Sequence, residues 1–110
     1  MLFLKLLYSS NIKHKMIIAE FAIFPTSEGV SVSKYVKKAI EEIKKSGLNY
    51  ESGAMSTTIE AKSLDEIFDV VKKAYEAIFK MGVKRIHIDL RIDHRLDKNA
   101  TIKSKKEAIL

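Results

Sequence analysis

Hydrophobic and charged residues alternate strictly along residues 83–93, near the C-terminal end of the chain. Aliphatic side chains occupy one parity, at Ile86, Ile88, Leu90 and Ile92, and polar side chains occupy the other, at Arg85, His87, Asp89, Arg91 and Asp93. This alternation predicts a half-buried strand, with one face in a core and the other facing outward. The outward face carries both charge signs and a histidine, which is more chemistry than a solvated sheet needs.

The chain before this strand begins with an apolar strand and an amphipathic helix. Residues 17–24 predict the strand, which Pro25 ends. The helix is expected to be capped by Ser31 or Ser33 and to run through Lys45, with apolar residues at helical spacing on one face.

A hairpin and a second helix follow. Residues 48–52 and 55–61 predict two short strands joined near Gly53. Ser63 and Glu66 have the spacing of a capping box, in which each side chain accepts a hydrogen bond from the other residue's backbone amide. The helix that they begin is expected to bury one stripe of apolar residues, namely Leu64, Ile67, Phe68, Val71, Ala74, Ile78 and Met81.

The resulting order, β-α-β-β-α-β, is typical of the split βαβ or ferredoxin-like sandwich of the α+β class. Right-handed crossovers place both helices on one face of a four-stranded antiparallel sheet. In this topology the first strand lies between the third and the fourth. The second face of the sheet, which we call the open face, is then expected to have no helix of its own.

Strand parity places a mixed set of side chains on the open face. Its predicted members are Ile18, Glu20, Ala22 and Phe24 from the first strand, Ser56, Thr58 and Glu60 from the third, and His87, Asp89 and Arg91 from the fourth. A bulge near Gly53 would exchange Thr57 and Thr58, because one slipped residue moves every side chain to the other face. The apolar members predict that another subunit partly buries this face.

Four interpretations fit these side chains. Glu20, His87 and Asp89 are residue types that could hold a metal ion. Glu20 or Glu60 could pair with His87 in acid–base catalysis, although no nucleophile motif, glycine-rich phosphate loop or cofactor fingerprint accompanies them. The carboxylates and hydroxyls could orient a small polar or cationic ligand, with the apolar neighbours covering its rings. The opposite charges could also pair across strands and make an oligomer interface specific.

Composition narrows the class of protein further. A chain of 110 residues without cysteine predicts one domain and excludes disulfides and thiolate metal sites. No apolar run approaches the length of a membrane span. Many lysines and isoleucines, with no glutamine or tryptophan, fit either a heat-adapted organism or a nucleotide-composition bias.

The net charge of +6 gives little support to nucleic-acid binding. Residues 1–15 contribute three lysines and no acid, and the remaining 17 basic and 14 acidic residues leave +3. Several of these bases lie in the C-terminal tail, at Lys98, Lys103, Lys105 and Lys106, and no aromatic residues interleave with them. We therefore expect a solvated basic tail rather than a nucleic-acid site.

Residues 1–15 do not resemble the rest of the chain. Their apolar run is interrupted by Lys5, no basic residue precedes it, and no small-residue cleavage site follows it, so it is a poor secretory signal. We expect residues 1–15 to be a leader outside the fold, from an upstream start codon, and residues 16–110 to be the single domain.

Three segments carry a family resemblance. They are Phe24-Pro25 with Gly29 and residues 31–36, residues 55–60 on the third strand, and Arg85 with residues 91–98, which contain an Asp-x-Arg-x-Asp-Lys sequence. Through them residues 16–109 resemble the small thiamine-binding proteins, a group with a ferredoxin-like fold that binds thiamine or its hydroxymethylpyrimidine part. Ala54, Ser56 and Ala61 depart from the proline, glycine and glycine that are usual there.

The resemblance implies a cytoplasmic homo-oligomer, a tetramer of two dimers whose open faces meet, with a thiamine-like ligand near that junction and no cofactor. Carboxylates and hydroxyls can read an aminopyrimidine through charge-assisted hydrogen bonds, and carboxylates suit a cationic thiazolium. The expected ligand-binding residues are Thr57 and Glu60, which match the family's motif, and Glu20, Thr58, His87 and Asp89, which come from strand parity. We expect binding without turnover. The alternatives are an enzyme of this fold acting on a small heteroaromatic substrate, or a structural oligomer with an ion-paired interface.

Overall fold

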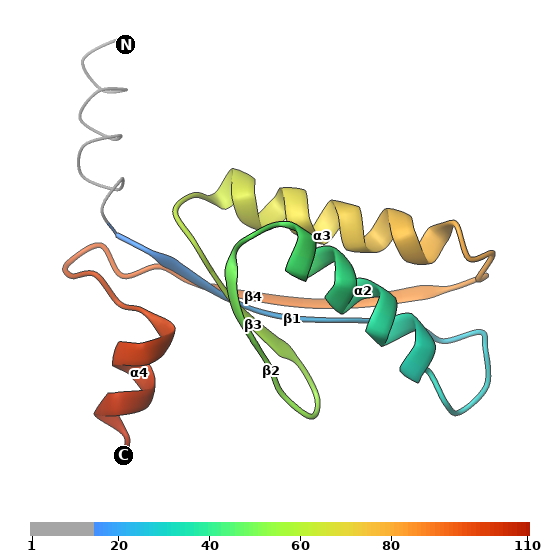
Figure 1. Cartoon of the computed structure of the whole chain (residues 1–110), viewed down its shortest axis with the longest axis horizontal. Helices are drawn as coiled ribbons and strands as arrows, with labels where there is room; N and C mark the ends of the chain where they lie inside the picture. The colour runs from blue at the N-terminus through green and yellow to red at the C-terminus, as the bar shows by residue number, and fades with distance from the viewer. Residues whose placement is uncertain (1–14) are drawn as a thin grey trace, which may run out of the picture.

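The computed structural model describes residues 15–110 as one sheet with helices packed against it (Figure 1). The strands are β1 (Ile17–Pro25), β2 (Asn49–Ser52), β3 (Thr57–Ala61) and β4 (Ile86–Asp93), and the helices are α2 (Ser33–Lys45), α3 (Leu64–Phe79) and α4 (Ile102–Ala108). The predicted leader falls almost entirely on residues 1–14, which lie outside the described part of the chain. No helix within residues 15–110 is long and apolar enough to cross a membrane.

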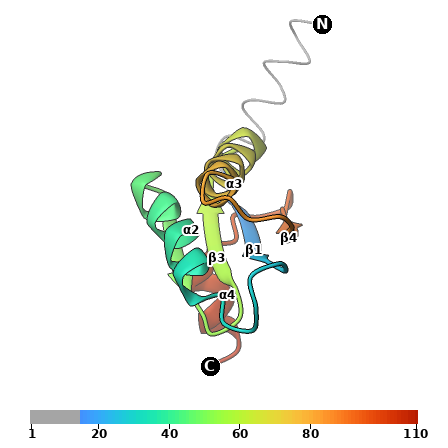
Figure 2. The same ribbon diagram turned by 90° about the vertical axis from the view of Figure 1, so that its right-hand side faces the viewer.

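The sheet has the order β2-β3-β1-β4, and each neighbouring pair of strands is antiparallel. Helices α2 and α3 pack on the same face, as the end-on view shows (Figure 2). This arrangement confirms the ferredoxin-like α+β fold. The register also confirms the predicted faces, because Glu20 of β1 lies opposite Thr58 of β3 on one side and Arg91 of β4 on the other.

The core lies between this sheet face and the two helices. Its largest fully buried side chains include Phe21 of β1, Ile43 of α2, Ile59 of β3 and Ile67 of α3. Each such side chain contributes about 1.5–3 kcal/mol by leaving water. The core therefore fixes which parity of each strand faces the helices, and with it which parity faces outward.

The stripe that α3 buries differs from the predicted one. The buried residues are Ile67, Val70, Ala74 and Ile78. Leu64, Phe68 and Met81, predicted to be in the core, remain 40%, 51% and 40% exposed. A helix that shares one sheet face with a second helix buries only the stripe between its neighbours, so apolar residues on its far flank stay at the surface.

The predicted helix caps are only partly correct. Ser63 Oγ accepts a hydrogen bond from Glu66 N at 3.2 Å, but the Glu66 carboxylate accepts from Lys62 N at 2.9 Å rather than from Ser63 N. At the start of α2, Val32 occupies the N-cap position and makes no side-chain bond, so neither Ser31 nor Ser33 caps the helix.

The basic tail is not a solvated extension, and the open face does carry a helix at one end. Helix α4 begins in a capping box, in which Ser104 N donates to Thr101 Oγ1 at 3.0 Å and Thr101 N donates to Ser104 Oγ at 2.8 Å. Ile102 is buried, and Lys106 Nζ lies 2.7 Å from the carboxylate of Glu51 on β2. These contacts fasten the tail to the sheet edge formed by β2.

Candidate functional site

Five of the six expected ligand-binding residues share the open face. Glu20, Thr58, Glu60, His87 and Asp89 all lie there, and Thr57 lies on the opposite face, against the helices. The register between β1 and β3 is continuous from Ile17↔Ala61 to Phe21↔Thr57, so no bulge exchanges Thr57 with Thr58. The two threonines therefore serve different sides of the sheet.

Glu60 is the most enclosed carboxylate of the open face, at 8% exposed. Its Oε2 accepts a hydrogen bond from Asn49 Nδ2 at 2.6 Å, and its Oε1 has no hydrogen-bond partner among residues 15–110. Glu20, on the neighbouring strand, accepts from Arg91 Nη2 at 3.3 Å and is about half exposed. Carboxylate oxygens on this part of the face can thus accept further donors.

His87 and Asp89 form a second polar pair, nearer the other end of the sheet. The His87 Nε2 and Asp89 Oδ2 atoms are 3.2 Å apart, and the His87 ring lies 5.1 Å from the Phe24 ring. His87 pairs with Phe24, whereas Glu60 pairs with Ile18, six residues away along β1. At the rise of a strand this separation is about 20 Å, so one chain does not bring His87 and Glu60 into an acid–base pair.

The residues considered for a metal site also remain apart. His87 lies opposite Phe24, Asp89 opposite Ala22, and Glu20 opposite Arg91, which takes its carboxylate instead. Within residues 15–110, no three histidine, aspartate or glutamate side chains are grouped closely enough to hold a metal ion.

Thr57 lies at a cavity of about 200 Å³ between α2 and the tip of the β2–β3 hairpin. Apolar side chains from both sides form most of its wall, among them Phe21, Phe24 and Val36, and the polar side chains in the wall are Ser56 and Thr57. Residues from both parities of β1 contribute, so the cavity reaches the gap between β1 and the hairpin tip.

The edge of β1 is unpaired at this cavity. Pairing with β3 stops at Phe21↔Thr57, while pairing with β4 continues to Pro25↔Ile86. Thr26 N donates to Arg85 O at 3.0 Å, which fixes the alternation of the antiparallel ladder and turns the N–H and C=O of Ile23 away from β4. Gly53 N bonds Ser56 O at 2.8 Å and closes the hairpin before it reaches Ile23.

Ile23 therefore holds a main-chain donor and acceptor at the cavity wall without a partner in residues 15–110. The residue is only 4% exposed. Buried main-chain groups are almost always hydrogen-bonded to protein, water or ligand. Sequence analysis missed this feature, because it depends on where the β1–β3 ladder ends rather than on a side chain. The stop after the short third strand was the available signal.

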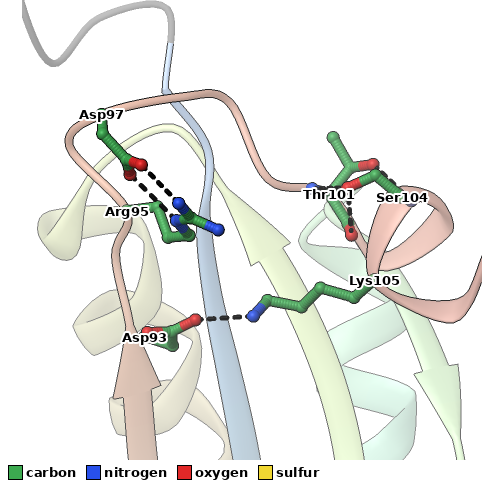
Figure 3. A network of polar contacts seen from close by, with 6 residues as sticks. All are labelled: Asp93, Arg95, Asp97, Thr101, Ser104 and Lys105. Carbon is green, nitrogen blue, oxygen red and sulfur yellow. Dashed lines mark hydrogen bonds and ion pairs between the residues drawn. The ribbon is translucent and has the colours of Figure 1, made fainter. Parts of the chain in front are cut away.

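The residues of the closing sequence motif hold the end of β4 to the tail rather than form a pocket (Figure 3). Lys105 Nζ lies 2.7 Å from Asp93 Oδ2, and its hydrogen bond and charge lower the pKa of Asp93. Arg95 Nε donates to Asp97 Oδ1 at 2.9 Å; this pairing lowers the pKa of Asp97 and raises the pKa of Arg95.

Comparison with known proteins agrees with this architecture. A protein of Methanocaldococcus jannaschii, UPF0045 protein MJ1052, is 45% identical over 95 residues, which cover 86% of this chain and 93% of that protein. The UPF0045 protein YqgV of Bacillus subtilis is 37% identical over 99 residues and covers 86% of this chain and 94% of its own length.

Two solved structures extend the comparison. The crystal structure of the M. jannaschii protein superposes with a TM-score of 0.80 over 86% of this chain and 96% of that one. A candidate thiamine biosynthesis/salvage protein from Thermotoga maritima superposes with a TM-score of 0.74 at 27% identity, over 86% and 99% of the two chains. Residues 19–110 match the family described as thiamine-binding protein. The chain therefore belongs to the thiamine-binding protein family.

Proposed function

We propose that this protein binds thiamine, or its hydroxymethylpyrimidine part, without turning it over. The observation that carries the proposal is the unpaired main chain of Ile23 beside an apolar cavity that also holds Thr57. An aminopyrimidine presents an amine donor next to a ring-nitrogen acceptor. A strand residue that offers C=O and N–H side by side is complementary to that pattern.

The size of the cavity suits one ring. Pockets for drug-sized molecules enclose about 300–1,000 Å³, whereas an apolar cavity of about 150 Å³ can hold benzene. A volume of about 200 Å³ matches a substituted pyrimidine but is too small for both rings of thiamine. The pyrimidine would lie between the apolar side chains, with Thr57 as a further hydrogen-bond partner.

The thiazolium ring would then lie on the open face. Ala22 lines the cavity and pairs directly with Asp89, and Glu20 is the next open-face residue along β1. Glu60 adds a third carboxylate to this face. Phe24 lines the cavity as well and lies against His87. Carboxylates and an aromatic face both favour a cationic ring. In this proposal all six expected residues contact one ligand, from the two sides of β1.

The absence of an assembled acid–base pair within the described chain favours binding over catalysis. His87 and Glu60 lie at opposite ends of the open face, and Glu20 is engaged by Arg91. The remaining candidate, an enzyme acting on a small heteroaromatic compound, is a defined outcome of the test below.

The test is calorimetric titration of the full chain with thiamine and with hydroxymethylpyrimidine, followed by chromatography of the recovered ligand. Thr57→Val removes one hydroxyl at constant shape and should weaken pyrimidine binding about fivefold to tenfold. Thr58→Val is the matched control, because it makes the same change one residue along on the open face, and it should leave pyrimidine binding unchanged. No heat with either ligand would refute binding, and a chemically altered ligand would establish an enzyme.

The proposal includes self-association in the cytoplasm, with open faces meeting in a tetramer. Ala22 and Phe24 support it, because both are apolar and only half-buried on that face in the single chain. Apolar groups on an outward sheet face favour contact with another protein surface. Light scattering should give a mass of more than one chain; a mass of one chain at all concentrations would contradict this part.

A further inference from the structure

The outer edge of β4 and the adjoining flank of α3 form a second apolar surface, distinct from the open face. We define this edge surface by Phe68, Tyr75 and Phe79 of α3 with Ile88 and Ile92 of β4. We infer that it binds a second copy of the chain, by antiparallel pairing of two β4 strands about a twofold axis at Leu90. Four strands from each copy would then form one continuous sheet. This inference does not depend on ligand binding.

The backbone of β4 is ready for such pairing. In the described chain β4 ends the sheet, and its ladder with β1 uses the N–H and C=O groups of one parity. The bond from Thr26 N to Arg85 O assigns the odd-numbered residues to that ladder. The N–H and C=O groups of Ile88, Leu90 and Ile92 therefore point away from the sheet, and an unpaired edge of this kind is a template for another strand.

The apolar side chains beside this edge are unusually exposed. Phe68 is 51% exposed, Phe79 62%, and Ile88 and Ile92 38% each. Lys73 and Ala77 form the other flank of α3, since they share a surface depression with α2 residues. The aromatic residues thus lie on the flank away from α2, where β4 is the neighbouring strand (Figure 2). A second copy would cover apolar surface that the single chain leaves in water.

The side chains select one register. Hydrogen bonding and face matching allow axes at several residues, but within Ile86–Asp93 only axes at Asp89 and at Leu90 pair most of the strand. An axis at Asp89 would oppose that carboxylate to its own copy and His87 to Arg91. An axis at Leu90 opposes Asp89 to Arg91 and His87 to Asp93 on one face. It opposes aliphatic residues to each other on the other face.

Charge complementarity of this kind identifies a second copy as the partner. Because a twofold axis repeats each contact, both ion pairs occur twice, and directly opposed unlike charges stabilise paired strands whereas like charges destabilise them. An unrelated partner strand would have to match the same alternation of charges without that symmetry.

The chain contains no cysteine, so a single introduced thiol reports on the contact. Leu90→Cys places two thiols on the axis, with Cα atoms about 5.5 Å apart in a hydrogen-bonded pair, a separation that a disulfide can span. Mild oxidation with diamide should convert this variant to a covalent dimer. The control Val30→Cys is fully exposed on a loop and should cross-link much more slowly. Faster cross-linking through Asp89→Cys than through Leu90→Cys would overturn the proposed register.

Charge reversal provides a second test. Asp89→Arg would oppose arginines at both copies of the pair, and Arg91→Asp would oppose aspartates, so each should raise the dimer Kd about tenfold or more. The double variant Asp89→Arg/Arg91→Asp restores opposite charges only if residue 89 of one copy meets residue 91 of the other. Sedimentation equilibrium should show dimerisation recovered in the double variant. Three variants with the same Kd as the parent, or a parent that stays monomeric, would overturn the inference.

Discussion

Thr57 and Phe21 form the last pair between β3 and β1, and beyond them β1 continues beside β4 alone. This end of the ladder creates the wall of the cavity and leaves the main chain of Ile23 unpaired. A binding site made in this way depends on strand length as much as on side-chain identity.

Filling the cavity should remove pyrimidine binding. Val36 is half-buried on α2 and lines the cavity, so Val36→Phe would place a ring where the ligand ring is expected. We expect the affinity for hydroxymethylpyrimidine to fall more than about tenfold, while the free energy of unfolding changes by about 1–3 kcal/mol at most. Calorimetry and urea denaturation measure the two quantities. Unchanged affinity in a folded variant would place the ring elsewhere.

Removing the charge of Glu60 should separate the two rings of thiamine. Glu60→Gln keeps the shape but loses the negative charge, so thiamine affinity should fall about fivefold, more at low salt than at high salt. The affinity for neutral hydroxymethylpyrimidine should stay nearly constant. Glu107→Gln on the exposed surface of α4 is the control. Equal losses for both ligands would show that Glu60 does not face the cationic ring.

The core prediction concerns stability alone. Ile59 is fully buried at the centre of β3, so Ile59→Ala should lower the free energy of unfolding by about 2–5 kcal/mol. The same substitution at Ile109, which is 84% exposed, should change it by less than about 0.5 kcal/mol. Urea unfolding monitored by circular dichroism measures both. Similar values for the two variants would contradict the assigned sheet faces.

The attachment of α4 should weaken in acid. Lys105 lowers the pKa of Asp93, so the contact stabilises the folded chain above the ordinary carboxyl pKa of 3.8 and is lost as pH falls through the lower folded value. Amide exchange in residues 102–108 should therefore speed up below about pH 4 relative to the sheet. Lys105→Ala should abolish this difference. Lys103→Ala, whose partner Glu107 lies on the same helix, should preserve it.

The sequence predicted the sheet well because parity is a strong constraint. Once Ile59 must face the core, Thr58 and Glu60 must face outward, and the same argument fixed the open-face members of β1 and β4. Family membership is also confirmed, although the ligand residues themselves remain proposals.

The parts that sequence analysis missed depend on contacts rather than on periodicity. Phe68 has the helical spacing of a core residue, but the flank it occupies has no neighbour within the chain. Helix α4 is short and rich in lysine, and its attachment through Ile102 and Lys106 becomes visible only when the sheet is present. Ser31 lost its predicted capping role because Val32 takes the N-cap position.

The four-residue tip of the hairpin, which Gly53 and Ser56 close, has a consequence for how such a site could be gained or lost. One extra residue on each arm would let β3 form its next rung with Ile23 and turn the cavity into ordinary sheet. That change would replace none of the side chains that line the cavity. Natural variation in ligand binding among proteins of this fold can therefore be written in hairpin length, where a comparison of individual positions would not detect it.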